Sequence, residues 1–89
     1  MLEVKPKRDP SVKWRSEDEN LVLYTPSESR IIVLNLTAGF IWKLADGEKT
    51  VEEIANEIIK EFEDVTKEKA VKDVEKVVNN LKKKGLLVQ

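Results

Sequence analysis

The sequence predicts an α+β domain in which a three-stranded antiparallel β-meander is followed by three helices. Two observations support this fold class. Apolar residues recur with a period of two, or in short β-branched runs, as far as Leu34, and with a period of 3.6 from Leu36 onward. Thr50 and Thr66 each precede a later apolar stripe, which is where a helix N-cap belongs. We therefore expect the element order β-β-β-α-α-α.

Three short segments in the first part of the chain have the character of strands. Residues 12–16 alternate, with Val12 and Trp14 on one face, which is typical of a half-buried strand. Residues 20–24 form a second apolar run, and residues 30–34 form a third that is rich in β-branched side chains. The connections between the runs are short and polar, which favours hairpins and hence a meander.

Three helices are predicted in the rest of the chain. Residues 36–44 place their apolar side chains on one stripe of a short helix. Thr50 and Glu53 form a capping box that begins the second helix. Thr66 begins the third helix, and Gly85 ends it because glycine accepts the positive φ that closes a helix.

The chain divides into a short lead-in and one domain. Residues 1–10 contain two prolines, mixed charges and no periodicity, so we expect a flexible N-terminal arm. The domain then comprises residues 11–89. With 89 residues in all, the chain is near the lower limit at which a single core is self-sufficient.

The composition excludes several classes of function. The chain has no Cys and no His, which removes the usual nucleophilic thiol, the commonest general base and the commonest transition-metal ligands. We therefore expect no enzymatic activity, no cofactor and no metal site. The sequence has no apolar run long enough to span a membrane and no secretory signal, which predicts a cytoplasmic protein with no membrane partner.

One set of residues is spaced as in a known family. These residues are Leu34-Asn35, Thr37-Ala38, Ile41-Trp42, Asp46-Gly47, the run from Thr50 to Ala55, Asp73-Val74, Leu81 and Gly85-Leu86-Leu87. By these residues the chain resembles the PqqD family and the wider class of recognition elements for ribosomally made precursor peptides. The resemblance covers most of the chain. It departs from the family at Val77-Val78, where the pattern favours a larger pair.

The resemblance implies a winged-helix-turn-helix-like domain without catalytic activity. Such a domain captures the leader segment of a precursor peptide and presents it to a separate maturation enzyme, often a radical-SAM enzyme. The implied binding mode is strand addition. The leader pairs antiparallel with the third strand and lies in a groove against the third helix.

The candidate peptide-binding residues lie on the third strand and the third helix. On the strand they are Arg30, Ile31, Ile32, Val33 and Leu34. On the helix they are Lys67, Val71, Val74 and Val78. The strand lacks the proline, lysine or bulge that usually blunts an open edge, so it is suited to pairing with a peptide. The alternative is that the N-terminal arm or the third helix masks this edge.

Other interpretations of the same fold remain open. A winged-helix DNA-binding module would use the third helix, where residues 66–84 contain seven lysines. The absence of Arg from that segment and the net charge of −1 argue against nucleic acid as a partner. A structural adaptor subunit would use the open edge for a folded protein. The edge can also pair with a second copy, so we expect a monomer or a weak homodimer.

Overall fold

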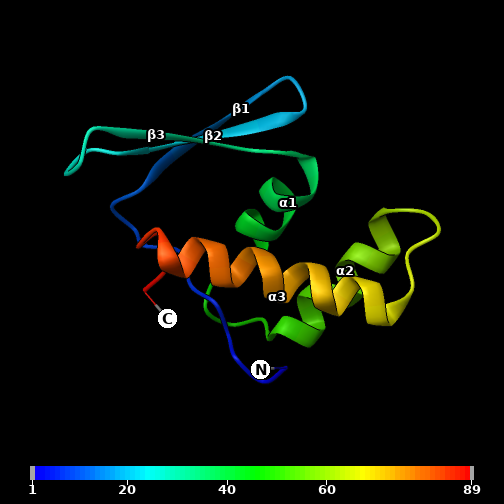
Figure 1. Cartoon of the computed structure of the whole chain (residues 1–89). Helices are drawn as coiled ribbons and strands as arrows, with labels where there is room; N and C mark the ends of the chain where they lie inside the picture. Colours follow the sequence, from blue (N-terminus) through cyan, green and yellow to red (C-terminus); the bar gives the residue numbers. More distant parts are fainter. Residues whose placement is uncertain (1, 89) are drawn as a thin grey trace.

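A computed structural model describes residues 2–88 of the chain (Figure 1). The strands are β1 (Lys13–Glu17), β2 (Asn20–Thr25) and β3 (Arg30–Leu34), which form one antiparallel sheet in the order β1-β2-β3. The helices are α1 (Leu36–Leu44), α2 (Val51–Glu61) and α3 (Lys67–Lys83). The predicted α+β fold, a meander followed by three helices, is therefore confirmed.

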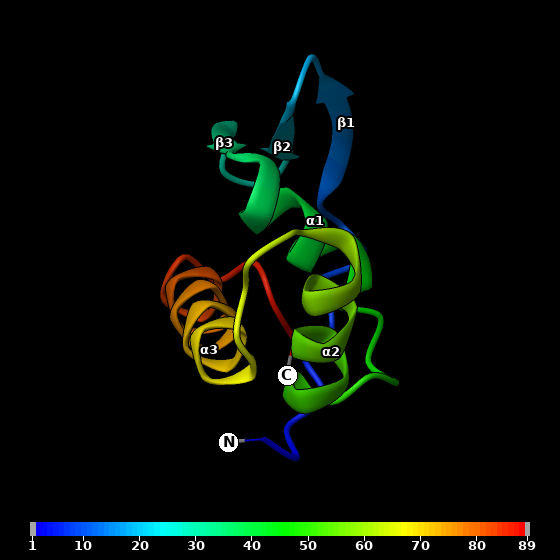
Figure 2. The same ribbon diagram turned by 90° about the vertical axis from the view of Figure 1, so that its right-hand side faces the viewer.

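The register of the sheet determines which side chains face the helices. Leu21 pairs with Leu34 and Leu23 pairs with Ile32, so these four side chains share the inner face. Helix α1 lies beneath this face (Figures 1 and 2). The approach is close at Gly39, where an added Cβ would lie 3.1 Å from the Cβ of Leu21. The absence of a side chain at Gly39 thus lets α1 pack directly on β2.

The helix ends follow from the capping residues that the sequence predicts. The Thr50 hydroxyl accepts a hydrogen bond from the Glu53 amide at 3.1 Å, and the Glu53 carboxylate accepts one from the Thr50 amide at 2.8 Å. This reciprocal pair confirms the capping box of α2. The Thr66 hydroxyl accepts from the Lys69 amide at 3.2 Å and begins α3, and Gly85 follows that helix with a φ of +72°.

The core consists of two clusters of buried side chains. One joins the three helices and contains Ile41, Val51, Ile54, Ala55, Ile58, Ala70, Val74 and Val78. The other lies between the sheet, α1 and the end of α3 and contains Val12, Leu21, Leu23, Trp42, Leu81 and Leu86. Helices α2 and α3 pack side by side below the sheet (Figure 2). The sheet is thus held above the helices mainly through the second cluster.

The lead-in segment lies along the domain. Main-chain hydrogen bonds of 2.9–3.0 Å join Val4 to Val51, Pro6 to Gly47, Arg8 to Ala45 and Asp9 to Leu86. Pro6 is fully buried. These contacts place the segment between the α1–α2 connection and the C-terminal tail. The division at residues 10 and 11 and the flexibility of the arm stay predictions, and Met1 and Gln89 lie outside the described residues.

Strand β1 differs from the half-buried strand that its alternation predicts. All five of its residues are exposed, and Trp14 retains 42% of its accessible surface. Val12 is buried, but it lies just before the strand. The reason is that alternation determines which side chains share a face, not whether anything covers that face. Helix α1 lies under β2 and β3 rather than under β1. The Trp14 ring lies instead beneath the Arg8 guanidinium, whose Cζ atom is 5.8 Å from the ring centroid.

Candidate functional site

The outer edge of β3 is unpaired within residues 2–88. Strand β3 is the last strand of the sheet, and the other backbone bridges join Lys7 to Asp46 and Arg8 to Leu87, away from β3. Neither the lead-in segment nor α3 therefore pairs with it, and the masked-edge alternative does not hold for the described residues. In an antiparallel strand, alternate residues turn both N–H and C=O away from the partner strand. These groups of β3 (Arg30–Leu34) are free to pair with an added strand, and we call this side the β3 edge.

The two faces of β3 have different surroundings. Ile31 and Val33 point to the outer face of the sheet and are exposed. Ile32 and Leu34 point inward and are half-buried. They pack against the same buried cluster as Val77 of α3. A strand added at the β3 edge would therefore place alternate side chains beside an apolar surface that β3 and α3 share.

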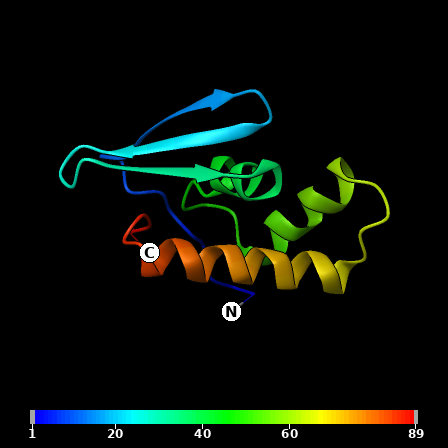
Figure 3. The ribbon, with the colours of Figure 1, turned by 45° about the horizontal axis from the view of Figure 1, so that its top comes forward.

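A hollow opens where β3 ends and α1 begins. Its volume is about 300 Å³, and its lining residues come from the start of α1 and from the middle of α3. They are Asn35, Thr37, Ala38, Asp73, Lys76, Val77 and Asn80. We call this feature the α1–α3 hollow. Figure 3 shows β3 as the strand of the sheet nearest to α3, so the β3 edge and the hollow lie on the same side of the molecule. The lining of the hollow combines the apolar side chains of Ala38 and Val77 with amide, carboxylate and ammonium groups.

Arg30 connects the far end of β3 to the end of α3. Its guanidinium donates a hydrogen bond to the main-chain carbonyl of Lys84 and lies 3.0 Å from the Glu28 carboxylate. The Nε atom of Arg30 is buried and has no hydrogen-bond partner among the described residues. The site thus runs from the contact between Arg30 and Lys84 at one end of β3 to the α1–α3 hollow at the other.

The structure places the predicted helix residues away from β3. Val74 and Val78 are fully buried and pack with α2, and Val71 is half-buried against the same cluster. The Lys67 ammonium lies 3.2 Å from the Glu52 carboxylate of α2. Of the predicted set, the structure therefore brings Arg30–Leu34 together at one edge but does not bring these four residues to it. Their role in peptide binding stays a prediction.

The residues of α3 that line the hollow are not among the peptide-binding residues predicted from the sequence. They are Asp73, Lys76, Val77 and Asn80. They follow one face of the helix at i, i+3, i+4 and i+7, which is a readable spacing. The pattern is not distinctive because Val77 is its only apolar member, whereas the neighbouring stripe contains Val71, Val74 and Val78.

Charged groups near the start of α3 are paired with one another. The Lys69 ammonium lies 2.9 Å from the Asp73 carboxylate, and the Lys72 ammonium lies 3.8 Å from Glu68. With the Lys67 pair, these contacts lower the positive potential that a DNA-binding helix needs. The described residues contain no cluster of three or more His, Cys, Asp or Glu side chains that could hold a metal ion, and no helix among them could span a membrane.

The pKa shifts found in the described residues lie at turns and helix caps. Hydrogen bonds from Ser11 lower the pKa of Asp9, and those from Thr50 lower the pKa of Glu53. The Glu48 amide and the Lys49 ammonium lower the pKa of Asp46 to about 2. The largest cause in each case is a local hydrogen bond that orders the backbone, so these carboxylates act as structural caps of turns and helices.

The fold and the site define a small α+β domain with an open β edge beside a hollow. Residues 20–87 match the family described as coenzyme PQQ synthesis protein D (PqqD). The match covers more than half of the chain, and the chain belongs to the PqqD family. It begins with β2, so β1 and the lead-in segment lie outside it. A comparison with curated proteins finds no match.

Two solved structures have the same fold. One is described as TbiB1 in complex with the TbiA(beta) leader peptide; it is 26% identical, with a TM-score of 0.81 over 92% of this chain and 94% of that chain. The other is described as lasso peptide synthetase B1 complexed with the leader peptide; it is 22% identical, with a TM-score of 0.82 over 96% of this chain and 99% of that chain. The second likeness supports the fold alone.

Proposed function

We propose that this chain binds the leader segment of a ribosomally made precursor peptide and presents the precursor to a separate modifying enzyme. The leader adds as a strand to the β3 edge, and some of its side chains enter the α1–α3 hollow. The observation that supports this function above all is the unpaired edge of β3 next to that hollow. The likeness to TbiB1, which was solved with a leader peptide, supports it further.

The energetics of strand addition fit a reversible carrier. A leader paired along β3 forms four to six main-chain hydrogen bonds, each with a net contribution of about 0.5–1.5 kcal/mol. Two or three leader side chains buried over Val77 and the inner side of β3 add about 1.5–3 kcal/mol each. Ordering a flexible peptide offsets part of this sum, which leaves a dissociation constant in roughly the micromolar to sub-micromolar range.

Affinity and sequence selectivity come from different parts of the site in this proposal. Main-chain hydrogen bonds bind any sequence, so the side chains of the hollow select the leader. The chain performs no chemistry in this scheme. A separate enzyme, for example of the radical-SAM class, modifies the peptide while this domain holds the leader. We place both in the cytoplasm, because ribosomal precursors are made there.

A pull-down with proline variants of β3 tests this function. Successive amides of β3 point to opposite sides of the strand. One of the variants Ile31→Pro and Ile32→Pro therefore removes an amide from the open side and keeps the hydrogen bonds to β2, whereas the other removes a hydrogen bond to β2. The variant that keeps the melting temperature of the wild type is the informative bait. A proline in β1, the other edge strand, is the matched control: Ser16→Pro or Glu17→Pro, whichever remains folded.

Source-cell lysate is passed over the wild-type, β3-variant and β1-control baits, and bound species are identified by mass spectrometry. We expect the wild type and the β1 control to retain a short peptide and a modifying enzyme, and the folded β3 variant to lose the peptide. Retention of the peptide by that variant would refute strand addition. Nucleic acid or a folded partner bound equally by all baits would favour the DNA-binding or adaptor function instead.

A further inference from the structure

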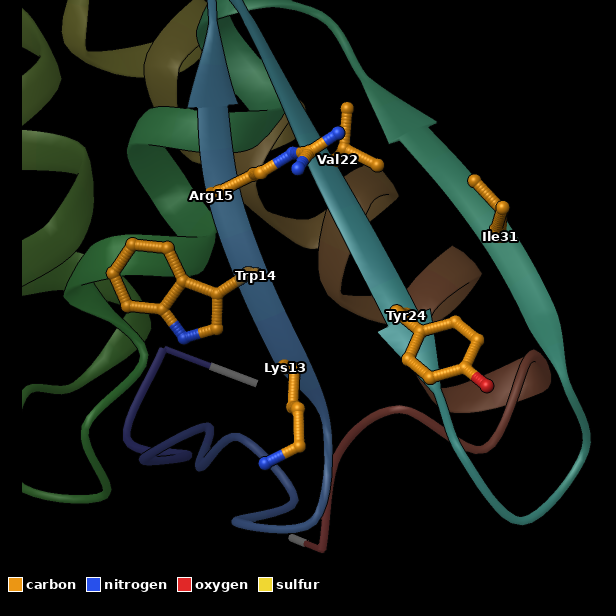
Figure 4. Close-up of a pocket in the computed structure, with 6 residues that line it drawn as sticks. All are labelled: Lys13, Trp14, Arg15, Val22, Tyr24 and Ile31. Carbon is orange, nitrogen blue, oxygen red and sulfur yellow. The ribbon is translucent and has the colours of Figure 1, made fainter.

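The face of the sheet that points away from the helices is apolar. The cross-strand pairs Val22–Val33 and Tyr24–Ile31 stand on it. Tyr24 is 40% exposed, Val33 60% and Ile31 67%. A shallow hollow of about 360 Å³ lies over this face, and Figure 4 shows the side chains that line it on β1, β2 and β3. We call this surface the outer face.

An apolar surface of this kind is typical of an interaction site. Charged residues make up 37% of the chain, yet they are absent from the four positions at the centre of the outer face on β2 and β3. Contiguous exposed apolar side chains on a small domain mark interaction surfaces, and an aromatic residue at the centre is typical of a binding hot spot. The three helices pack on the opposite side of the sheet (Figure 2), so the described part of the chain leaves this face open.

The outer face is continuous with the β3 edge because β3 contributes to both. Its residues alternate, so Ile31 and Val33 belong to the outer face while Ile32 and Leu34 point toward the helices. A leader strand added at the edge extends the outer face by one strand and places alternate leader side chains beside Ile31 and Val33. A protein seated on this face would then contact the domain and the bound leader at the same time.

We propose that the outer face is the docking surface for the modifying enzyme, and that the bound leader completes it. This inference rests on the proposed function, since it concerns the partner that receives the leader. Because the enzyme contacts leader side chains as well as Tyr24, it binds the loaded domain more tightly than the empty one. By linkage, the enzyme also strengthens leader binding by the same factor.

The charges beside the outer face specify the chemistry of the enzyme's surface. Lys13 and Arg15 flank Tyr24 and Val22 on the β1 side. Arg15 pairs with Glu17 at 2.6 Å, whereas the Lys13 ammonium forms none of the ion pairs found in residues 2–88. The complementary surface is an apolar patch bordered by carboxylates, because opposite charges at the rim steer association.

Two variants test the docking surface without touching the β3 edge. Tyr24→Thr removes the aromatic ring but keeps a β-branched residue that suits a strand. Lys13→Glu reverses the rim charge. Lys60→Glu, an exposed charge reversal on α2, is the matched control. The probes are the precursor peptide and the enzyme recovered in the pull-down described above, and the measurements are leader affinity and the initial rate of modification at limiting enzyme.

We expect both variants to bind leader within threefold of the wild type. Their modification rate at limiting enzyme should fall at least tenfold and recover at saturating enzyme, while Lys60→Glu behaves as the wild type. An unchanged rate in both variants would overturn the proposal, and so would a loss of leader affinity, which would assign the face to the leader. A wild-type dimer that Tyr24→Thr dissociates in sedimentation would assign it to a second copy.

These outcomes are separable from failure of the proposed function, because that function is tested by leader binding to the wild type and its loss in the β3 variant, whereas the docking surface is tested by variants that keep leader binding. If Tyr24→Thr does not fold, the charge reversal at Lys13 decides the question alone. Circular dichroism of each variant establishes which case applies.

Discussion

The guanidinium of Arg30, the first residue of β3, donates a hydrogen bond to the main-chain carbonyl of Lys84, the C-cap residue of α3. The two residues are 54 positions apart in the sequence. Their contact joins one end of the β3 edge to the helix that lines the α1–α3 hollow. Together with the second core cluster, it therefore holds the strand that would pair with a leader against the helix that would receive its side chains.

Replacing Arg30 by Met should weaken both stability and leader binding. The substitution keeps the aliphatic stem and removes the hydrogen bond to Lys84, so we expect the free energy of unfolding to fall by about 1–2 kcal/mol. Leader affinity should fall about threefold to tenfold because the first residue of β3 loses its contact with the end of α3. Glu28→Gln keeps the Lys84 contact and removes only a surface ion pair, so its effect should stay within about 0.5 kcal/mol. Urea unfolding and fluorescence titration measure the two quantities, and equal effects of both variants would contradict this role of Arg30.

Adjacent valines of α3 should have separate roles. Val77 is half-buried in the α1–α3 hollow, whereas Val78 is fully buried against α2. We expect Val77→Ser to reduce leader affinity about tenfold and to cost less stability than truncation of Val78, because Val77 is only half-buried. Val78→Ala should cost roughly 2 kcal/mol of stability and leave the affinity of the folded protein unchanged. If truncation of Val78 reduced leader affinity and truncation of Val77 did not, the leader would bind the helix face that contains Val74 and Val78.

Hydrogen exchange should reveal the direction of each amide in β3. Strand addition protects only amides that point to the open side, so leader binding should slow exchange at alternate residues of the segment from Arg30 to Leu34. The intervening amides already bond to β2 and should change little. NMR-detected exchange with and without leader peptide measures this pattern. Uniform protection along β3, or protection confined to α3, would show that the peptide binds in another way.

Stability should decrease in acid partly because of Asp46. Hydrogen bonds, first from the Glu48 amide and then from the Lys49 ammonium, lower the pKa of Asp46 from 3.8 to about 2. A pKa that is lower in the folded state means that the carboxylate stabilises the fold above a pH of about 4 and that this stabilisation is lost as the pH falls toward about 2. Asp46→Asn should therefore be less stable than the wild type at neutral pH and lose less stability between these two pH values.

Urea unfolding at several pH values checks this expectation. Glu63→Gln, which removes an exposed carboxylate just after the end of α2, serves as the control. Parallel curves for Asp46→Asn and the wild type between pH 4 and pH 2 would mean that other groups determine the acid sensitivity.

Much of the fold follows from local sequence chemistry. Thr50 and Glu53 specify the start of α2 because each satisfies a backbone amide that the helix leaves free. The β-branched run from Arg30 to Leu34 specifies β3, whose bounds the structure reproduces. The open β3 edge was also predictable, since a meander of three strands has two outer edges and this one contains no proline or lysine.

The helix side of the site was not predictable from periodicity. Val77 and Val78 are neighbours and both apolar, so two overlapping stripes run along α3. Periodicity shows that both stripes are suitable for burial, but it does not show which faces α2 and which faces the sheet. That choice depends on how α2 and the sheet are placed around α3, which is a tertiary property. The same limit explains why the alternation of β1 did not reveal its exposure.

The open β3 edge also has a consequence for the behaviour of the protein in concentrated solution. An edge that must accept a peptide strand cannot be guarded by proline, lysine or a bulge, and the same edge is a template for aggregation. Solubility must then come from the rest of the surface, where 33 charged side chains, 16 basic and 17 acidic, keep molecules hydrated. Added salt screens these charges but leaves the edge open. A bound peptide covers the edge, so overproduction of the protein without its peptide should yield more fibrous aggregate than co-production with the peptide.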